Sequence, residues 1–308
     1  MPRPLLRLSK ALLAMADGTP PDEIRSDLKD LGLQRIDQKT YQGRSYCLAS
    51  STRAVPSGPT GRRVAILHCH IFKNAGSSVD ILLRETFGTR FIQQEFATRQ
   101  GDSNADLVRS FIRCRTDMDA FSTHTGDWWL HYGDKDLLVL PILFLRHPLL
   151  RIQSAYRFER TQDADTYGAR MAKTLGFADY VRNRLERPRD FAFRNFQARR
   201  VAAFESRTIT DLASLARTGF ERLPFLGIVE DFDASIRRLE AYLRPHFPAF
   251  TARPVIANRT DGGTQSLAER LDAIRSDLGK DLYRDLRNAN DLDFHLYDAA
   301  RARDALAA

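Results

Sequence analysis

Short apolar runs alternate with amphipathic segments from residue 64 onwards, and this alternation limits the folds open to the chain. Residues 64–67 form a run typical of a buried strand, and residues 78–87 repeat apolar side chains at helical spacing. Further strands are predicted at 118–122 and 137–145, with Pro141 indicating a bend within the second run or the entry point of its strand. Strands that alternate with helices predict an α/β fold, with a central parallel sheet flanked by helices. The other predicted helices cover residues 149–160, 176–186, 233–244 and 265–287, the last with a stripe of Leu267, Leu271, Ile274 and Leu278.

The first 60 residues differ in pattern and predict a small N-terminal extension. Residues 4–16 and 20–31 have helical patterns, and residues 40–48 alternate as a strand or a hairpin around Gly43. A segment rich in Ser, Pro and Gly follows at 50–61, as is typical of a linker. We therefore expect an accessory segment with its linker at 1–60 and the main domain at 61–308.

Charge and cysteine content narrow the class of protein. The chain has 308 residues and a formal net charge of +8, which favours anionic partners such as nucleotides, acidic sugars, nucleic acid or acidic lipid. Three cysteines without a C-x-x-C spacing argue against a disulfide framework or a zinc site, and indicate a reducing, cytoplasmic compartment. No apolar run approaches the roughly 18 residues of a transmembrane helix. Residues 1–16, interrupted by Lys10, indicate an amphipathic helix rather than a signal peptide.

Residues 70–78, with the sequence HIFKNAGSS, join the first predicted strand to the first predicted helix. Small residues at such a turn let several backbone N–H groups point at one spot, where the helix dipole adds partial positive charge. Ser77 and Ser78 can donate hydroxyl hydrogen bonds and Lys73 supplies a full charge, so the segment predicts a phosphate or sulfate site. The alternative is an ordinary helix cap beside a surface lysine. Lys73 precedes Gly76, unlike the lysine of a Walker loop, and this order suits a shorter anhydride than a nucleoside triphosphate.

A second cationic position follows the apolar run at 137–145. Arg146 stands at the end of this predicted strand, and a helix carrying Arg151 and Ser154 comes next. An arginine there can form a two-pronged contact with a phosphate, whereas the alternative is a surface arginine. Two such patterns in order, each at a strand end, indicate one ligand site, because α/β sheets bind ligands at these ends. The strand has no terminal acid to serve as a Walker-B metal ligand, which disfavours a kinase.

These two segments resemble those of the sulfotransferase family, and most of all its carbohydrate-type group with Golgi and bacterial members. Residues 70–78 are similar to the family's 5′-phosphosulfate loop, Pro-Lys-x-Gly-[Ser/Thr]-[Ser/Thr], although Phe72 replaces the usual Pro and Ala75 a frequent Gly. Residues 146–156 resemble the family's 3′-phosphate segment, with His147 where Asp is common. The resemblance implies a P-loop-like fold, 3′-phosphoadenylyl sulfate as co-substrate, and no metal. It places that donor on Lys73, Asn74, Ala75, Gly76, Ser77, Ser78, Arg146 and Ser154.

Further segments extend the resemblance to about residues 62–300, leaving the first 60 residues outside it. Residues 195–199 are similar to the family's Asn-x-Gln-x-Arg, and residues 226–232 to its Gly-x-x-Glu-x-[Phe/Met] strand. Asn258 stands where the family carries Asn before a helix, and residues 290–297 resemble its closing Asn-x-x-Asp-x-x-x-Tyr.

The resemblance also implies roles in sulfuryl transfer to a hydroxyl or amine of a carbohydrate or another small hydroxylated acceptor. Lys73 would stabilise the charge that develops on the leaving phosphate. His124, in the sequence STHTG after a predicted strand, is similar to the Thr-His position of many sulfotransferases, and a neutral imidazole can take the acceptor's proton. His70 beside the loop is the competing base, and Glu85 and Glu95 stay open because some relatives use Glu.

An arginine-rich stretch at 182–200 carries seven Arg against one Glu and one Asp, a local charge of +5. It predicts either a solvated helix face or a groove for an acidic oligosaccharide. Phe191, Phe193 and Phe196 interleave with it and can stack on rings or belong to the core. Two other functions remain open, an atypical nucleotide-dependent kinase and a non-catalytic basic module that binds acidic glycan or nucleic acid. No specific nucleic-acid partner is expected, and the sequence leaves the oligomeric state open.

Overall fold

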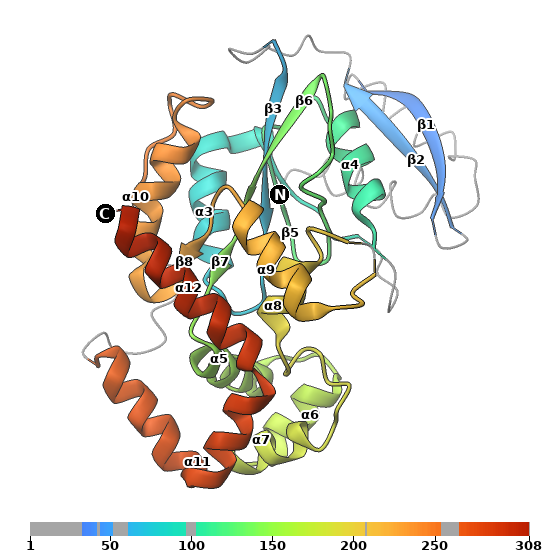
Figure 1. Cartoon of the computed structure of the whole chain (residues 1–308). Helices are drawn as coiled ribbons and strands as arrows, with labels where there is room; N and C mark the ends of the chain where they lie inside the picture. Colours follow the sequence, from blue (N-terminus) through green and yellow to red (C-terminus); the bar gives the residue numbers. More distant parts are fainter. Residues whose placement is uncertain are drawn as a thin grey trace. The chain divides into compact units, whose positions relative to one another are not determined.

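The computed structural model describes residues 33–41, 44–51, 61–96, 103–206, 208–253 and 265–307 (Figure 1). The chain divides into two compact units. The first unit comprises residues 1–69 and 83–141, and the second unit comprises residues 70–82 and 142–308. Each unit has its own set of candidate functional residues.

A four-stranded sheet forms the centre of the first unit. Its strand order is β4 (Phe91–Gln93), β5 (Ala120–Thr123), β3 (Arg63–Cys69) and β6 (Leu137–Ile142). β3 and β4 both run parallel to β5, with Cys69 opposite Thr123 and Gln93 opposite Ser122. The chain thus has the expected α/β fold, with a parallel central sheet flanked by helices.

Burial explains why these segments are strands. The apolar run of β3 is fully inside, since Ala65, Ile66 and Leu67 are at most 1% exposed. Helix α4 (Ala105–Cys114) buries an apolar face in the same unit, and its Phe111 meets Phe121 of β5 edge to face at 6.0 Å. A strand buried on both faces reads as a continuous apolar run, and this is the signal that the sequence carried.

A two-stranded hairpin precedes the sheet along the chain. β1 (Leu33–Tyr41) pairs antiparallel with β2 (Arg44–Ser51), and Tyr41 lies opposite Arg44. The predicted hairpin around Gly43 is therefore confirmed, and it extends beyond residues 40–48. The helices predicted at 4–16 and 20–31 and most of the predicted linker lie outside the described residues, as does Asn258.

Among the residues that the structure describes, the second unit contains one strand pair and most of the helices. β7 (Phe144–Leu145) runs parallel to β8 (Gly227–Ile228). The apolar run at 137–145 is divided into two strands, because the chain leaves β6 at Ile142, just after Pro141, and enters β7 two residues later. Helix α3 (Gly76–Phe87) begins in this unit and ends in the first. The other helices are α5 (Pro148–Thr161), α6 (Tyr167–Thr174), α7 (Phe177–Leu185), α8 (Phe196–Ala202), α9 (Leu212–Arg222), α10 (Phe232–Leu243), α11 (Leu267–Ala289) and α12 (Asp291–Ala307).

Helices α5, α7 and α11 share one apolar core in the second unit. Ile152, Tyr156 and Val181 are buried there, together with Ile274 and Leu278 of α11. The predicted stripe on α11 is confirmed, because its other members, Leu267 and Leu271, pack against the same core. None of the helices in the described ranges has the length and apolar character needed to cross a membrane.

Candidate active site

The segment between β3 and α3 has an unusual backbone. Lys73 and Ala75 adopt left-handed φ angles of 67° and 58°. Residues other than glycine rarely do so, because the side chain then crowds the backbone. A turn closed by the Asn74 N–H on the Ile71 carbonyl (3.1 Å) precedes the first turn of the helix, where Ser78 N–H bonds to Ala75 C=O at 3.0 Å. Strained residues of this kind cluster at ligand-binding loops, where the surrounding structure holds them in place.

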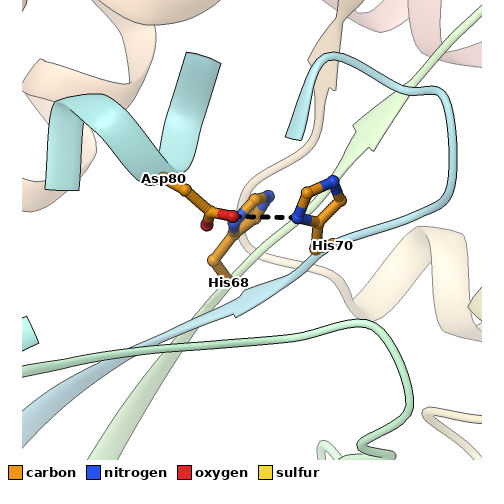
Figure 2. Close-up of side chains that lie close together, drawn as sticks. All are labelled: His68, His70 and Asp80. Atoms are coloured by element: carbon orange, nitrogen blue, oxygen red, sulfur yellow. Dashed lines mark hydrogen bonds and ion pairs between the residues drawn. The ribbon is translucent and has the colours of Figure 1, made fainter. Parts of the chain in front are cut away.

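His70 supports this loop from inside the second unit. Its Nδ1 lies 2.9 Å from Asp80 Oδ2, and both side chains are buried (Figure 2). The ring lies against Gly76, where an added Cβ would come within 2.0 Å of His70 Cδ2. The third residue drawn, His68, belongs to the first unit, where its Nδ1 lies 3.1 Å from Ser122 Oγ. A buried ring held by a carboxylate and packed on a glycine has the geometry of a support, so His70 is the weaker of the two histidine candidates for a base.

Lys73 lies over an aromatic pair. Its Nζ is 4.6 Å from the ring centroid of Phe158 on α5, and Phe72 meets Phe158 edge to face at 5.4 Å. Phe158 is 40% exposed, which is high for a large apolar side chain. Burial lowers the pKa of Lys73, and the nearby positive charge of Arg146 lowers it further. The ammonium group is thus placed where a bound anion would stabilise its charge.

Arg146 follows β7 and reaches the same loop. Its Nη1 donates a hydrogen bond to the backbone carbonyl of Lys73 at 3.0 Å, and its Nε lies 3.8 Å from Glu230 Oε1. The structure therefore brings together Lys73 and Arg146, the two cations predicted from separate segments. Two converging cations beside a helix N-terminus can bind a ligand with more than one anionic group.

Gln197 forms hydrogen bonds both to Arg146, which follows β7, and to Asn74 in the loop between β3 and α3. Its Oε1 accepts hydrogen bonds from the Arg146 N–H (2.9 Å) and from Asn74 Nδ2 (2.7 Å), and its Nε2 donates to the Arg146 carbonyl (2.9 Å). Asn74 Nδ2 also lies 2.7 Å from the Phe144 carbonyl. Both amide side chains are buried, so leaving any of these groups without a partner would be costly. Gln197 is a site residue that sequence reasoning named only through the family resemblance.

Glu230 holds the residue after Arg146. Its carboxylate accepts hydrogen bonds from the His147 N–H at 3.1 Å and from the Tyr297 hydroxyl at 3.0 Å. Burial raises the pKa of Glu230, although Arg146 and these donors oppose that effect. Burial lowers the pKa of His147 to about 4, helped by Arg287 and other nearby arginines. The imidazole is therefore neutral at pH 7, and it sits edge-on to the rings of Phe294 and Tyr297 at 5.3 Å each.

Asp293 and Asn195 anchor the helix that carries Gln197. Asp293 accepts hydrogen bonds from the N–H groups of Gln197 (3.2 Å) and Ala198 (2.7 Å) at the start of α8, where a carboxylate complements the helix dipole. Asn195 has a left-handed φ of 48° and accepts from the Leu292 N–H at 3.1 Å. The predicted segments at 195–199, 226–232 and 290–297 thus meet in one buried network behind Arg146.

The serines of the site differ in their surroundings. Ser78 is buried in the first turn of α3, whereas Ser77 is exposed. Ser154 is half-buried on α5, and within the described part of the chain its hydroxyl has no hydrogen-bond partner. The structure thus brings Arg146 to the loop but shows no contact between Arg146 and Ser154.

A second cluster lies in the first unit, at the carboxyl ends of β4 and β5. His124 Nδ1 is 2.7 Å from Glu95 Oε1, and the His124 N–H donates to the same carboxylate at 3.0 Å. Thr125 adds its N–H at 3.0 Å and its hydroxyl at 2.8 Å. Although burial raises the pKa of Glu95, the hydrogen bonds from His124 and Thr125 outweigh it and hold that pKa below its usual value.

The ionised Glu95 selects one tautomer of His124. A carboxylate can only accept, so Nδ1 carries the proton and the lone pair of the ring is on Nε2. The His124 side chain is 44% exposed. A carboxylate that orients an imidazole in this way is the usual arrangement of a general base. Glu95 entered the sequence analysis as a competing base, and the structure gives it the place of a partner to His124.

Comparison with known proteins identifies the family of the chain. A family model described as "Sulfotransferase family" matches residues 60–298, which is most of the chain. The chain belongs to the sulfotransferase family. The enzyme is also similar to an uncharacterized protein of Archaeoglobus fulgidus, with 37% identity over 246 residues that cover 77% of this chain and 95% of the relative.

The sulfotransferase transfers a sulfuryl group to an acceptor. A leaving group that gains negative charge needs cations and backbone N–H groups near it. An acceptor that loses a proton needs a base with an accessible lone pair. Lys73 and Arg146 lie in the second unit of the sulfotransferase, and His124 and Glu95 lie in its first unit.

Proposed function

We propose that the sulfotransferase takes its sulfuryl group from 3′-phosphoadenylyl sulfate and transfers it to a hydroxyl, or an amine, of a carbohydrate. The observation that carries the proposal is the bond between Arg146 and the backbone of Lys73, which joins two cationic positions into one site. A donor with a phosphosulfate at one end and a separate phosphate at the other needs two such positions. The family generally uses this donor, which supports the assignment.

On the donor side, the loop from Lys73 to Ser78 receives the phosphosulfate on backbone N–H groups and serine hydroxyls. Arg146 binds the 3′-phosphate, and Ser154 adds a hydroxyl to it. Because Arg146 is also hydrogen-bonded to the Lys73 carbonyl, a phosphate on the arginine would help to fix the lysine. No step requires a metal ion, because Lys73 can stabilise the leaving phosphate as a point charge.

On the acceptor side, His124 takes the proton from the acceptor oxygen or nitrogen as that atom attacks sulfur. The bond between sulfur and the bridging phosphate oxygen breaks, and its electron pair leaves with adenosine 3′,5′-bisphosphate. Lys73 stabilises the new negative charge. Glu95 keeps the His124 ring in the accepting tautomer and stabilises the imidazolium that forms.

The arginine-rich stretch at 182–200 supports a carbohydrate acceptor with acidic groups, and the cysteine content supports a cytoplasmic location. We place the catalytic domain at 61–308 and treat residues 1–60 as an accessory segment that affects acceptor access. Deleting that segment should alter the ranking of acceptors more than the affinity for the donor product, as measured by activity on an acceptor panel and by calorimetry. An unchanged ranking would contradict this role.

Calorimetric titration with adenosine 3′,5′-bisphosphate, alongside ATP with Mg²⁺, tests the proposed donor. We expect the bisphosphate to bind and Arg146→Ala to weaken it 10- to 100-fold, as for the loss of hydrogen bonds to a charged group worth about 1.5–3 kcal/mol. Arg146→Lys keeps the charge but loses the forked contact, so its affinity for the bisphosphate should lie between those of the parent and Arg146→Ala. Arg182→Ala, at an exposed arginine on α7, is the matched control. Binding of ATP with Mg²⁺ but not the bisphosphate would refute the proposal.

A further inference from the structure

The second unit contains a cavity of about 800 Å³ that the donor site does not account for. It lies between the end of α5, the start of α6 and the segment after α7. Its walls combine aromatic rings with arginines, and include Phe72, Glu159, Tyr167, Arg187, Arg189 and Phe191. The volume falls in the range of small-molecule binding sites.

The charges at one wall of this cavity neutralise one another. Arg184 is 5% exposed and forms ion pairs with Asp190 and with Glu159, the latter at 3.3 Å. The Tyr180 hydroxyl donates to Glu159 at 2.7 Å. The lining of the cavity contains three arginines and two acidic residues. Both acids pair with Arg184, so the positive charge that a ligand would meet comes from Arg187 and Arg189.

Those two arginines are available to a ligand. Both are exposed, and among the described residues neither has a carboxylate partner. Arg187 stacks its guanidinium over the Tyr167 ring at 4.1 Å, and the Tyr167 hydroxyl is fixed by Asn183 Oδ1 at 2.6 Å. Stacking uses the face of a guanidinium and not its N–H edge, and this edge can bind a carboxylate or sulfate through two parallel hydrogen bonds.

Phe72 links the cavity to the reacting loop. Its ring lines the cavity, it precedes Lys73 in the chain, and it packs on Phe158, over which the Lys73 ammonium lies. An occupant of the cavity therefore touches the residue next to the lysine that we assign to the leaving phosphate. This contact with the loop favours an acceptor as the occupant of the cavity.

We propose that this cavity binds an acidic sugar unit of the acceptor, with its ring face against Phe72 and Tyr167 and its carboxylate or sulfate on Arg187 and Arg189. Aromatic rings pair with the apolar face of a pyranose, and the two exposed guanidinium groups select against its neutral counterpart. The inference rests on the proposed function and deepens it, because it assigns the class of acceptor and the residues that recognise it.

Binding of two matched oligosaccharides to the full chain, saturated with adenosine 3′,5′-bisphosphate, tests the inference. One probe is a hexasaccharide of alternating glucuronic acid and N-acetylglucosamine, and the other is its carboxyl-reduced form. We expect calorimetry to give at least tenfold tighter binding of the acidic probe. Arg187→Gln and Arg189→Gln should each reduce this preference severalfold, whereas Arg217→Gln, at an exposed arginine on α9, should leave it unchanged. Phe72→Leu should weaken both probes to a similar extent.

The affinity for the bisphosphate separates the possible failures. If the bisphosphate itself does not bind, the proposed function fails. Two outcomes would show that the inference about the cavity is wrong, provided that the bisphosphate binds equally well to all variants. In the first, the parent enzyme binds the acidic and the carboxyl-reduced hexasaccharide with equal affinity. In the second, Arg187→Gln and Arg189→Gln keep the parent's preference for the acidic hexasaccharide. Binding of neither hexasaccharide to the bisphosphate complex would overturn it as well.

Discussion

The Lys73 ammonium lies over an exposed phenyl ring and beside a second cation. This is a half-buried site that lowers the pKa of Lys73, through burial first and Arg146 second. Such a group gains most from an anion that appears during the reaction. The role of the lysine is therefore expected to be larger in the transition state than in the bound donor.

Replacing Lys73 with Met should lower kcat by about 10²- to 10³-fold, as for the loss of one stabiliser of developing charge. Affinity for the bisphosphate should change less than kcat. Lys173→Met, at an exposed lysine on α6, is the control, and single-turnover kinetics with equilibrium binding is the measurement. A loss confined to KM, with kcat unchanged, would contradict the role.

Glu95 acts through His124 in the proposed mechanism. Glu95→Gln removes the charge that fixes the ring tautomer, so kcat should fall about 10- to 100-fold while the affinity for the bisphosphate stays the same. Since hydrogen bonds hold the pKa of Glu95 below its usual value, this contact should persist as the pH falls to 5 in the parent enzyme. Glu85→Gln, the other glutamate considered as a base, is the control. Equal loss in both variants would argue against the pair.

At the scale of elements, the β3–α3 connection depends on one missing side chain. Any Cβ at position 76 would meet the His70 ring, which cannot retreat easily because Asp80 holds it. The loop, His70 and the first turn of α3 are therefore expected to move together.

Gly76→Ala should displace His70 and reduce the affinity for the bisphosphate by an order of magnitude or more, since a contact of 2.0 Å forces a shift. Gly176→Ala is the matched control, because nothing lies within 4 Å of a Cβ there. Adding His70→Ala to the Gly76→Ala variant should restore part of the affinity by removing the clash. Calorimetric titration of the three variants would measure this, and wild-type affinity in Gly76→Ala would refute the steric account.

The sequence predicted the elements whose signals are local. The loop at 70–78, the arginine after its strand and the apolar stripe on α11 each depend on neighbouring residues, and the structure places them as expected. The bond between Asn74 and Gln197 joins positions 123 residues apart, and no local pattern reveals such a contact. Helix α9 was missed for a related reason, since only Ala216 and Gly219 are buried in it. The break between β6 and β7 comes just after Pro141, where the sequence indicated a bend or the entry point of a strand.

At the scale of the whole molecule, acid should weaken the fold through His147. Its pKa is about 4 in the folded chain and 6.5 as the ordinary value, so at pH above 6.5 both states are neutral. Below 6.5 the unfolded chain gains a proton that the folded chain excludes. The free energy of unfolding therefore falls as the pH drops from 6.5 towards 4.

His147→Gln removes this dependence and isolates it from other groups. Between pH 7 and pH 5 the parent should lose about 2 kcal/mol more than the variant, the value of 1.5 pKa units. Denaturant unfolding at the two pH values gives the difference. Because Glu230 and Asp293 are present in both proteins, their titration cancels. Equal losses would show that the buried ring does not control acid stability.

The hydrogen bond between Arg146 and the Lys73 carbonyl has a consequence for which step limits the rate of turnover. When adenosine 3′,5′-bisphosphate departs, the like charges of Lys73 and Arg146 stay close to each other, and the Arg146 side chain remains bonded to the Lys73 carbonyl. The bound nucleotide offsets the repulsion between these two cations, and its departure restores that repulsion, so we expect release of the spent nucleotide to be slower than the transfer itself. A rapid burst of sulfated acceptor, equal to the enzyme concentration and followed by a slow steady rate, would reveal this order of events.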